Sequence, residues 1–346
     1  MSVALLVAAL FSFDSIDYMI DVIFFQADRQ DASLSFASDV GSAAIANVAA
    51  LPGVIRAEPF RATQVKLRNQ HHEVKMSLIA LSAGSQLSRI LDMDMNPMDP
   101  PPNGLVISER VAAKLNLRPG DMVEIELTRK GRRIAYAPIV GIAQSYVGLT
   151  AYASLPSLNS LMRDGSLISG ARVVIDQNDL AELYTEVKNT PAIAGIALQD
   201  ISRQKFRETI EENIVTMTTV YVALAVIITF GVIYNSARIQ LSERARELAS
   251  LRVFGFTPAE VSKVLLIELS VIVLAAQPLG WLLGYLFSWW VIQGFSSDLF
   301  RVPFVVDPAT FAWASIVVLS SALVSALIVR RRVNRLDLIR VLKTRE

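Results

Sequence analysis

The chain of 346 residues contains no cysteine and only two histidines, and both absences restrict its chemistry. Without cysteine it has no thiol nucleophile, no disulfide framework and no cysteine-ligated zinc. The two histidines, His71 and His72, are adjacent, and so few histidines argue against a histidine-rich metal site and against a Ser-His-Asp triad. The sequence also lacks a GxxxxGK[ST] phosphate loop and a GxSxG nucleophile elbow. These absences argue against a membrane-anchored hydrolase and favour a non-catalytic protein.

Charged residues are also scarce. They make up 19% of the chain and hydrophobic residues 53%, whereas an ordinary soluble domain is about 25% charged. The net charge of +1 gives no electrostatic reason to expect nucleic-acid binding. The distribution is uneven, because residues 26–212 hold 20 of the 33 Lys and Arg, while residues 213–346 hold three long apolar stretches. This pattern predicts a soluble domain inserted into a membrane protein.

Three apolar stretches are long enough to cross a bilayer as helices, which takes about 20 residues each. They run from about 214 to 234, from about 264 to 295 and from about 308 to 329.

The N-terminal segment is a fourth candidate span. Residues 1–13 are apolar, but a helix of that length rises only about 20 Å. Asp14, Asp17 and Asp21 follow at spacings of three and four, and so share one face of a helix. We interpret residues 1–25 as a truncated transmembrane helix that continues outward as an amphipathic stalk. A signal peptide is the alternative, although the segment lacks a basic n-region and a small-residue cleavage site.

Basic residues predict the orientation of the spans, since short cytoplasmic loops are rich in Lys and Arg. Five lie in residues 237–263 and seven follow residue 329, whereas residues 296–307 hold only Arg301. We therefore expect residues 237–263 and the tail in the cytoplasm and residues 26–205 outside it. The predicted fold is an α-helical membrane protein with four transmembrane helices, the first truncated, and a large extracytoplasmic α+β domain between helices 1 and 2.

Two similar βαβ-like units are expected to open and close this domain. The first predicts a strand, a helix and a strand at residues 33–38, 39–50 and 54–66. The second predicts the same order at residues 171–175, 179–187 and 193–198. Ser38 or Asp39 is the expected N-cap of the first helix. Because the two units flank an insert at about 82–165, they predict a split α+β sandwich.

The insert and the residues before it carry strand and turn signals of their own. Further strands are expected at residues 105–108, 122–127 and 134–142, with a helix at residues 109–115. Ser108 is the expected cap of that helix. Before the insert, a hairpin is expected to turn at Gln70–Glu73, and His71 and His72 then belong to an exposed polar turn rather than a metal site.

Residues 203–240 contain no proline and a single glycine, Gly231. They predict one continuous helix of about 57 Å, reaching from the outer domain through the second span. Such a stiff helix transmits a displacement that a flexible linker would absorb. The alternative is a break near Asn213.

Residues 235–268, NSARIQLSERARELASLRVFGFTPAEVSKVLLIE, form the most informative stretch. A short amphipathic helix is expected at about 241–254, ended by Gly255 before Pro258 begins the next helix. One interpretation is a helix on the cytoplasmic membrane surface without a partner. Alternating charges of both signs favour a protein contact instead.

These residues carry a resemblance to a known family. The run ERARELASLRVFGFTPAEVSKVLLIE, the proline and glycines of the next span and the ending LDLIRVLKTRE resemble the FtsX-like permease domain of ABC transporters of the MacB and LolC/LolE type. The segment GLVISERVAAKLNLRPGDMVEIEL resembles the extracytoplasmic domain of the same permeases. In that family the first span is full length and preceded by basic residues, so this chain resembles the second half of a duplicated permease or a product with a misplaced start.

The resemblance implies a division into three parts. These are the truncated helix 1 and stalk at 1–25, the extracytoplasmic domain at 26–205 and the FtsX-like permease domain at 206–346. Within the last part, the expected segments are the stalk and second span at 203–240, the coupling helix at 241–254, the later spans at 259–295 and 308–330, and a basic cytoplasmic tail.

The resemblance also implies a function. The chain would be a permease subunit of the bacterial cytoplasmic (inner) membrane, without catalysis or a cofactor of its own, that couples a separate ATPase using ATP and magnesium to motion of the outer domain. Family members export or release lipoproteins, lipids, peptides or drugs. The alternative is a non-transporting FtsX-like scaffold or signalling protein that regulates a cell-envelope enzyme.

Partners and site residues follow from the same resemblance. The implied partners are the cytoplasmic ATPase, a second copy or a second permease half, an extracytoplasmic protein and membrane lipids, and no nucleic acid. The implied ATPase-coupling residues are Glu243, Arg244, Arg246, Glu247, Leu248, Leu251, Arg252 and Gly255. In the third span, Pro278, Gly280 and Gly284 predict a hinge or a helix-packing face, or only a local kink.

Overall fold

The computed structural model describes residues 1–127, 133–243, 250, 254–294 and 301–334. The chain divides into two compact units. The helical unit comprises Met1–Ile16, Ile210–Phe295 and Phe304–Glu346. The strand-rich unit comprises Asp17–Thr209 and Ser296–Pro303.

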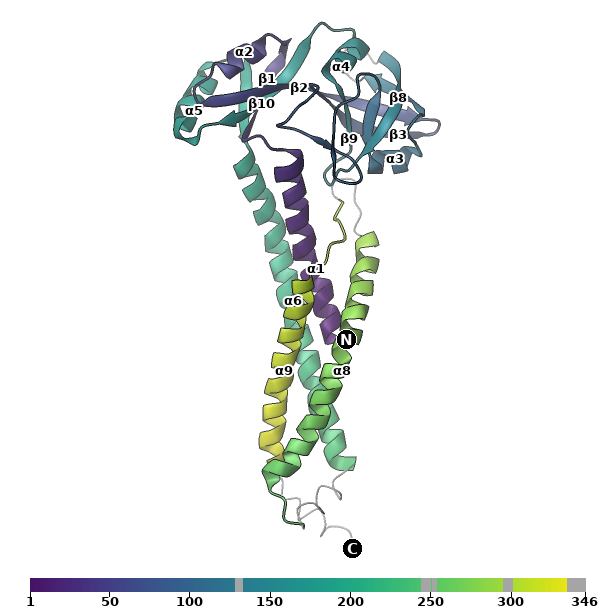
Figure 1. The fold of residues 1–346 in the computed structure, drawn as a ribbon, viewed down its shortest axis with the longest axis vertical. Coiled ribbons are helices and arrows are strands. Elements are labelled where there is room, and N and C mark those ends of the chain that lie inside the picture. Colours follow the sequence, from purple (N-terminus) through teal and green to yellow (C-terminus); the bar gives the residue numbers. More distant parts are fainter. Residues whose placement is uncertain (128–132, 244–249, 251–253, 295–300, 335–346) are drawn as a thin grey trace. The chain divides into compact units, whose positions relative to one another are not determined.

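Long helices supply the helical unit (Figure 1). They are α1 (Ser2–Asp21), which a π-helical turn η1 (Val22–Ala27) continues, α6 (Gln199–Glu243), α8 (Pro258–Gly294) and α9 (Pro308–Asn334). Four segments within them are long and apolar enough to cross a membrane, namely Ser2–Ala27, Gln199–Ser236, Leu266–Gly294 and Pro308–Ile328. Helix α6 runs without a break through Asn213 over 45 residues, and α1 and α6 each contribute to both units.

The strand-rich unit consists of two lobes built on one nine-stranded sheet in the order β11-β1-β10-β2-β3-β9-β6-β8-β7. The four-stranded lobe contains β1 (Ala32–Gly41), α2 (Ala44–Ala49), β2 (Val54–Asn69), β10 (Leu167–Ile175), α5 (Leu180–Asn189) and β11 (Ile193–Leu198). Strands β1 and β2 lie on either side of β10 and both pair antiparallel with it. This is the split βαβ arrangement that the two similar sequence units predict.

The barrel lobe lies between β2 and β10 in the chain. Its elements are β3 (His72–Leu81), β6 (Leu105–Ser108), α3 (Glu109–Leu115), β7 (Met122–Leu127), β8 (Arg133–Ala143), β9 (Thr150–Ser154) and α4 (Leu155–Met162). A small hairpin, β4 (Ile90–Leu91) and β5 (Pro97–Met98), and a 3-10 turn, η2 (Gln177–Asp179), complete the unit. Because β7 pairs with β2 as well as β8, strands β2-β3-β9-β6-β8-β7 close a ring.

Each lobe has its own apolar core. The four-stranded lobe packs Leu34 and Val173 against Val48 of α2 and Leu183 of α5. The barrel core contains Leu67, Ile107 and Ile125 together with residues of α3 and α4. Buried residues alternate with less buried ones along much of β2 and β3, as is typical of strands that have one face in a core.

Most expected strands are present, but one helix prediction is wrong. The helix expected from Ser38 or Asp39 to Ala50 begins only at Ala44, and Ala43 at its N-cap position makes no side-chain cap bond. Residues 38 and 39 belong to β1 instead. The physical reason is that the Asp39 carboxylate forms an ion pair with Arg61, 3.0 Å away, and therefore does not cap a helix.

The second cap prediction is right in position only. Ser108 occupies the N-cap of α3 as expected, but its side chain makes no cap hydrogen bond. Ser154, which the sequence did not single out, caps α4 by accepting a hydrogen bond from the Ser157 N–H at 3.3 Å.

Candidate functional site

The described residues include only part of the expected coupling segment. Glu243 is the exposed last residue of α6. Gly255 has a φ of 95°, a conformation that glycine adopts without strain. Phe254 and Phe256 on either side of it are 82% and 48% exposed. The other expected coupling residues, Arg244, Arg246, Glu247, Leu248, Leu251 and Arg252, lie outside the described residues.

A reciprocal cap begins α8 directly after this segment. The Glu260 carboxylate accepts hydrogen bonds from the Thr257 N–H at 2.7 Å and from the Thr257 hydroxyl at 2.8 Å. The Glu260 N–H donates back to the Thr257 hydroxyl at 3.3 Å. These bonds, above all the one from the Thr257 N–H, hold the pKa of Glu260 below its ordinary value. The capping box, with Pro258 as the first helical residue, fixes where α8 begins after the expected coupling segment.

Helix α8 approaches α1 closely at two glycines. A Cβ atom added at Gly280 would lie 2.7 Å from Val3 Cβ, and one added at Gly284 would lie 2.7 Å from Val7 Cβ. Small residues that allow such approach are typical of packed membrane helices. The structure thus places both glycines in a helix–helix contact, and the proposed hinge role of Pro278, which lies inside α8, stays a prediction.

Buried polar groups lie on the same helix. The Trp281 Nε1–H donates to Ser315 Oγ of α9 at 2.8 Å, which connects α8 to α9. Gln277 is 7% exposed and donates from its amide to the Val273 carbonyl at 3.2 Å. Its neighbour Pro278 has no N–H, so the helix loses one of its own backbone bonds there.

The acidic residues of α1 each have a defined partner. The Asp14 carboxylate accepts from the Asp307 N–H at 2.9 Å and from the Thr310 hydroxyl at 2.6 Å, at the start of α9. Asp17 forms an ion pair with Arg207 of α6 at 3.1 Å, and Asp21 accepts from the Gln26 amide at 2.7 Å. The polar face that the aspartate spacing predicts therefore serves to join helices and to end α1.

The parts of α1 and α6 inside the strand-rich unit are joined by side chains. The rings of Phe24 and Phe206 have centroids 5.9 Å apart. The Arg203 guanidinium lies 5.0 Å from the centroid of the Phe25 ring, within cation–π range. Together with the Asp17–Arg207 ion pair, these contacts hold the two helix segments side by side.

Asp31 connects both helices to the four-stranded lobe. Its N–H donates to the Val173 carbonyl at 2.9 Å, and its carboxylate accepts from the Ile175 N–H at 3.0 Å. Its own carbonyl accepts from the N–H of Gln199, the first residue of α6, at 2.8 Å. One residue between α1 and β1 thus bonds both to β10 and to the start of α6.

A loop from the barrel lobe also reaches the end of α1. Arg29 donates its N–H to the Leu87 carbonyl and Arg89 donates its N–H to the Ala27 carbonyl, both at 2.8 Å. The loop is anchored in turn on Glu58 of β2, whose carboxylate is nearly buried. That carboxylate accepts from Ser85 Oγ at 2.6 Å and from the N–H groups of Gln86 and Leu87 at 3.0 Å each.

The electrostatics of Glu58 follow from this setting. Burial alone would raise the pKa of Glu58, but the hydrogen bonds it accepts and the nearby Arg56 guanidinium outweigh burial and hold the pKa below its ordinary value. Arg56 lies 2.6 Å from the carboxylate. Glu58 is therefore an ionised anchor for the loop at the end of α1.

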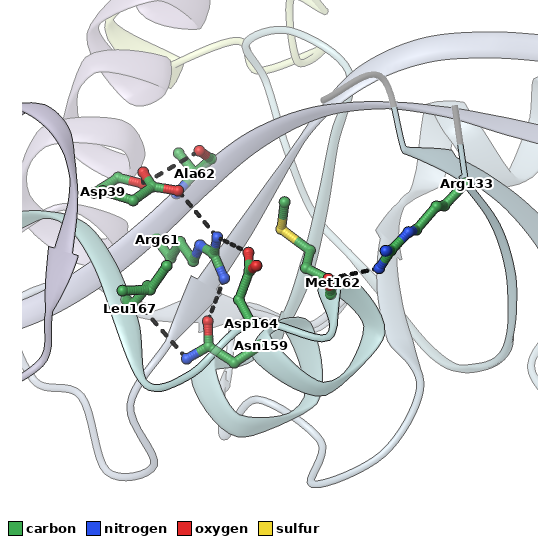
Figure 2. Close-up of polar contacts among 9 residues, drawn as sticks. Asp39, Arg61, Ala62, Arg133, Asn159, Met162, Asp164 and Leu167 are labelled. Atoms are coloured by element: carbon green, nitrogen blue, oxygen red, sulfur yellow. Dashed lines mark hydrogen bonds and ion pairs between the residues drawn. The ribbon is translucent and has the colours of Figure 1, made fainter. Parts of the chain in front are cut away.

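A buried arginine occupies the junction of the two lobes (Figure 2). Arg61 of β2 is 1% exposed. Its guanidinium forms ion pairs with Asp39 at 3.0 Å and Asp164 at 2.6 Å, and donates a hydrogen bond to the Asn159 side-chain carbonyl. We call Asp39, Arg61, Asn159 and Asp164 the Arg61 cluster. Sequence reasoning missed it, although a charged residue within the alternating apolar pattern of β2 was the available signal.

The four-stranded lobe also carries a cavity. It has a volume of about 500 Å³ and is lined by residues of β1, α2, α5 and β11, most of them apolar, with the Glu186 carboxylate among them. Among the described residues no group of histidine and acidic side chains is arranged to hold a metal ion.

Comparison with known proteins identifies the C-terminal part of the chain. Residues 219–338 match the family model described as FtsX-like permease C-terminal, so this part of the chain is similar to FtsX-like permeases. The match spans the end of α6, the expected coupling segment, α8 and α9. No curated protein matches the chain. Both the family and the four apolar helices indicate a membrane protein.

Two solved structures are similar to the strand-rich part. The first is the extracellular domain of the noncanonic ABC-type transporter YknZ from Gram-positive bacteria, with 13% identity and a TM-score of 0.33 over 47% of this chain and 98% of that chain. The second is the periplasmic region of MacB from Actinobacillus actinomycetemcomitans, with 12% identity and a TM-score of 0.34 over 54% of this chain and 97% of that chain.

Proposed function

We propose that this chain is a permease subunit of an ABC transporter that transmits motion from a cytoplasmic ATPase to its strand-rich unit. The observation that carries the proposal is the FtsX-like permease match over residues 219–338, which contains the coupling segment. In this proposal the segment from Glu243 to Gly255 lies in the cytoplasm and binds the ATPase, which alone uses ATP and magnesium. The strand-rich unit lies on the outer side of the bacterial cytoplasmic membrane.

The unbroken α6 supports transmission of motion. A helix of 45 residues is about 68 Å long. A continuous helix resists bending, whereas a flexible linker would absorb a displacement. The bonds at Asp31 and the contacts between Phe24 and Phe206 continue this connection into the four-stranded lobe. Closure of the ATPase would therefore move the lobe, and the substrate would be handled outside the membrane.

The substrate class is a broader proposal. Lipoproteins, lipids, peptides and drugs all fit a permease of this kind. A second permease chain, either another copy or a different half, would complete the transporter, and an extracytoplasmic protein is a further expected partner. The competing proposal is a non-transporting scaffold that regulates a cell-envelope enzyme. The two differ in whether ATP hydrolysis moves a substrate out of the membrane.

The coupling assignment is tested by pull-down of the ABC ATPase with which this chain is proposed to act. Leu248→Asp and Glu247→Lys are each expected to abolish recovery of the ATPase, because they place a charge or reverse one in the proposed contact. Membrane insertion should be intact in both. Glu182→Lys, the same charge reversal on the exposed face of α5, is the matched control and should recover the ATPase normally. Normal recovery from both coupling variants would refute the assignment.

A further inference from the structure

We infer that the Arg61 cluster is a lock that fixes the barrel lobe to the four-stranded lobe, so that the barrel follows the motion of the two long helices; this role rests on the proposed function. The cluster lies where β2 passes from one lobe to the other. Up to Phe60, β2 pairs with β10, and from Phe60 onward it pairs with β3. Arg61 is thus the first residue after the change of partner strand.

The partners of Arg61 come from both lobes. Asp39 lies in β1 of the four-stranded lobe, beyond a shift in register between Ser35 and Val40. Asn159 belongs to α4, and Asp164 follows α4 directly. Helix α4 is part of the barrel, since its residues Leu158 and Met162 are buried in the barrel core. One guanidinium therefore holds a carboxylate from each lobe.

Burial makes the ion pairs of Arg61 with Asp39 and Asp164 energetically costly to break. Asp164 is 6% and Asp39 17% exposed at the side chain, beside an Arg61 side chain that is 1% exposed. Separating the lobes would leave a buried cation and a buried carboxylate without their partners, which is strongly unfavourable. The planar guanidinium, with several donors in a fixed geometry, ties the three acceptors to one orientation.

Further hydrogen bonds support the cluster from the strand that returns to the four-stranded lobe. Ser169 of β10 donates from its hydroxyl to the Asp39 carboxylate at 2.8 Å and accepts from the Ala62 N–H at 3.3 Å. The Asn159 amide donates to the Leu167 carbonyl at 3.3 Å. Figure 2 shows the bonds of Arg61 itself to Asp39, Asn159 and Asp164, with the Asn159–Leu167 bond beside them. Both chain crossings between the lobes, at residues 60–62 and 162–169, are therefore held by the same cluster.

The lock matters because α6 is attached to the four-stranded lobe, so the barrel must follow its motion through the contacts between the lobes. Among the described residues, the start of α6 bonds through Asp31 to β10 of the four-stranded lobe. The barrel reaches α1 and its continuation through the loop that Glu58 anchors and through the edge-to-face contact of Tyr146 with Tyr18, whose ring centroids are 6.3 Å apart. Loss of the Arg61 cluster should therefore loosen the barrel without detaching it, and the barrel should then no longer follow the helices faithfully.

The distance between the lobes tests the lock directly. Because the chain has no cysteine, Thr185→Cys on α5 and His71→Cys at the tip of the β2–β3 turn give the only two spin-label sites in the full-length protein. Double electron–electron resonance should show a narrow distance distribution in this background. Arg61→Met should widen it severalfold. Arg68→Met, on the same strand and 39% exposed, is the matched control and should leave the width unchanged. An unchanged width in Arg61→Met would overturn the inference.

Hydrogen exchange distinguishes local loosening at the Arg61 cluster from a general loss of folding. If Arg61→Met does not fold, Asp164→Asn, which keeps the side-chain size, replaces it in both measurements. We expect exchange about ten- to a hundredfold faster at residues 37–41 and 159–169, with the cores of both lobes still protected. Equal acceleration throughout both cores would show a general stability role and would overturn the lock.

The test of the lock gives a result that does not depend on whether the proposed function is right. Distances and exchange are measured without ATPase or nucleotide, so failure of coupling does not affect them. In the pull-down, Arg61→Met should recover the ATPase as the wild type does, whereas Leu248→Asp should not. Loss of ATPase recovery in Arg61→Met would contradict a role confined to the two lobes.

Discussion

At the scale of single residues, the clearest organising groups are charged side chains with several partners that hold segments together. Glu58 anchors the loop at the end of α1, Asp31 joins β10 to α6, and Arg61 joins the lobes. Each has several hydrogen-bonding partners, and such partners matter most for Glu58 and Arg61, which are buried, because an unpaired buried charge is costly.

Glu58 predicts a pH dependence. Because the folded-state pKa of this carboxyl lies below its value of 4.5 in the unfolded chain, its stabilising contribution is complete above that pH and is lost as the pH falls through the folded pKa. Glu58→Gln should lower the free energy of unfolding of the strand-rich unit by about 1–3 kcal/mol at pH 7. The difference from the wild type should shrink below pH 4.5.

Urea unfolding of this unit, followed by circular dichroism at several pH values, checks the expectation. Glu182→Gln, at an exposed position of α5, controls for the loss of one negative charge. A constant difference between Glu58→Gln and the wild type across the pH range would contradict the anchoring role.

Local sequence signals predicted some caps and missed others for a physical reason. Thr257 and Pro258 begin α8 as expected, because their capping box involves only residues three positions apart. Asp39 carried the same kind of signal but lies in β1, because Arg61, distant in sequence, binds its carboxylate. A helix cap whose hydrogen bonds all lie within one turn can be predicted from the sequence. A residue that could cap a helix but instead forms an ion pair with a distant residue cannot be predicted in this way.

At the scale of secondary-structure elements, α8 is held by contacts with two neighbouring helices. Its glycines lie against α1, and Trp281 bonds to α9. Gly284→Ala should destabilise the helical unit by about 1–3 kcal/mol, because the added Cβ meets Val7 and forces the helices apart. Thermal unfolding in detergent measures the change.

Gly231→Ala on α6 is the matched control for this substitution. Nothing lies within 4 Å of a Cβ added at Gly231. Since alanine favours a helix over glycine, the control should gain up to about 1 kcal/mol. Equal shifts in unfolding temperature for the two variants would refute close packing at Gly284.

Helix α6 is the element that the proposed transmission needs unbroken. Thr216→Pro should break it at a cost of about 3 kcal/mol, leaving ATPase recovery unchanged while removing any effect of ATP on the strand-rich unit. The labelling rate of a cysteine at Thr185, with and without ATP, reports that effect. Thr216→Ala should retain it. An ATP effect of normal size in Thr216→Pro would show that α6 need not be continuous.

The helices were more predictable than the connections between strands. Apolar runs of about 20 residues are long signals and mark spans reliably, and strand periodicity identified most of β2, β3 and β7. The closure of six strands into a ring was not predictable, because the pairing of β2 with β7 joins Val65 to Leu127, far apart in the sequence. The Arg61 cluster depends on that long-range topology and was missed with it.

At the scale of the whole molecule, function depends on which side of the membrane each part occupies. The family match and the four apolar spans indicate a membrane protein. The account further requires the coupling segment and the strand-rich unit to lie on opposite sides, since an ATPase that works in the cytoplasm must act on one and substrate must meet the other. The uneven distribution of basic residues in the loops is the basis of that expectation.

Labelling of single cysteines with a membrane-impermeant maleimide in intact cells most directly tests whether the coupling segment and the strand-rich unit lie on opposite sides of the membrane. The chain's own lack of cysteine makes each introduced thiol the only target. Thr185→Cys in α5 should be labelled from outside, and Ser250→Cys in the coupling segment should be labelled only after the membrane is permeabilised. Labelling of both positions from outside at similar rates would place them on the same side and contradict the account.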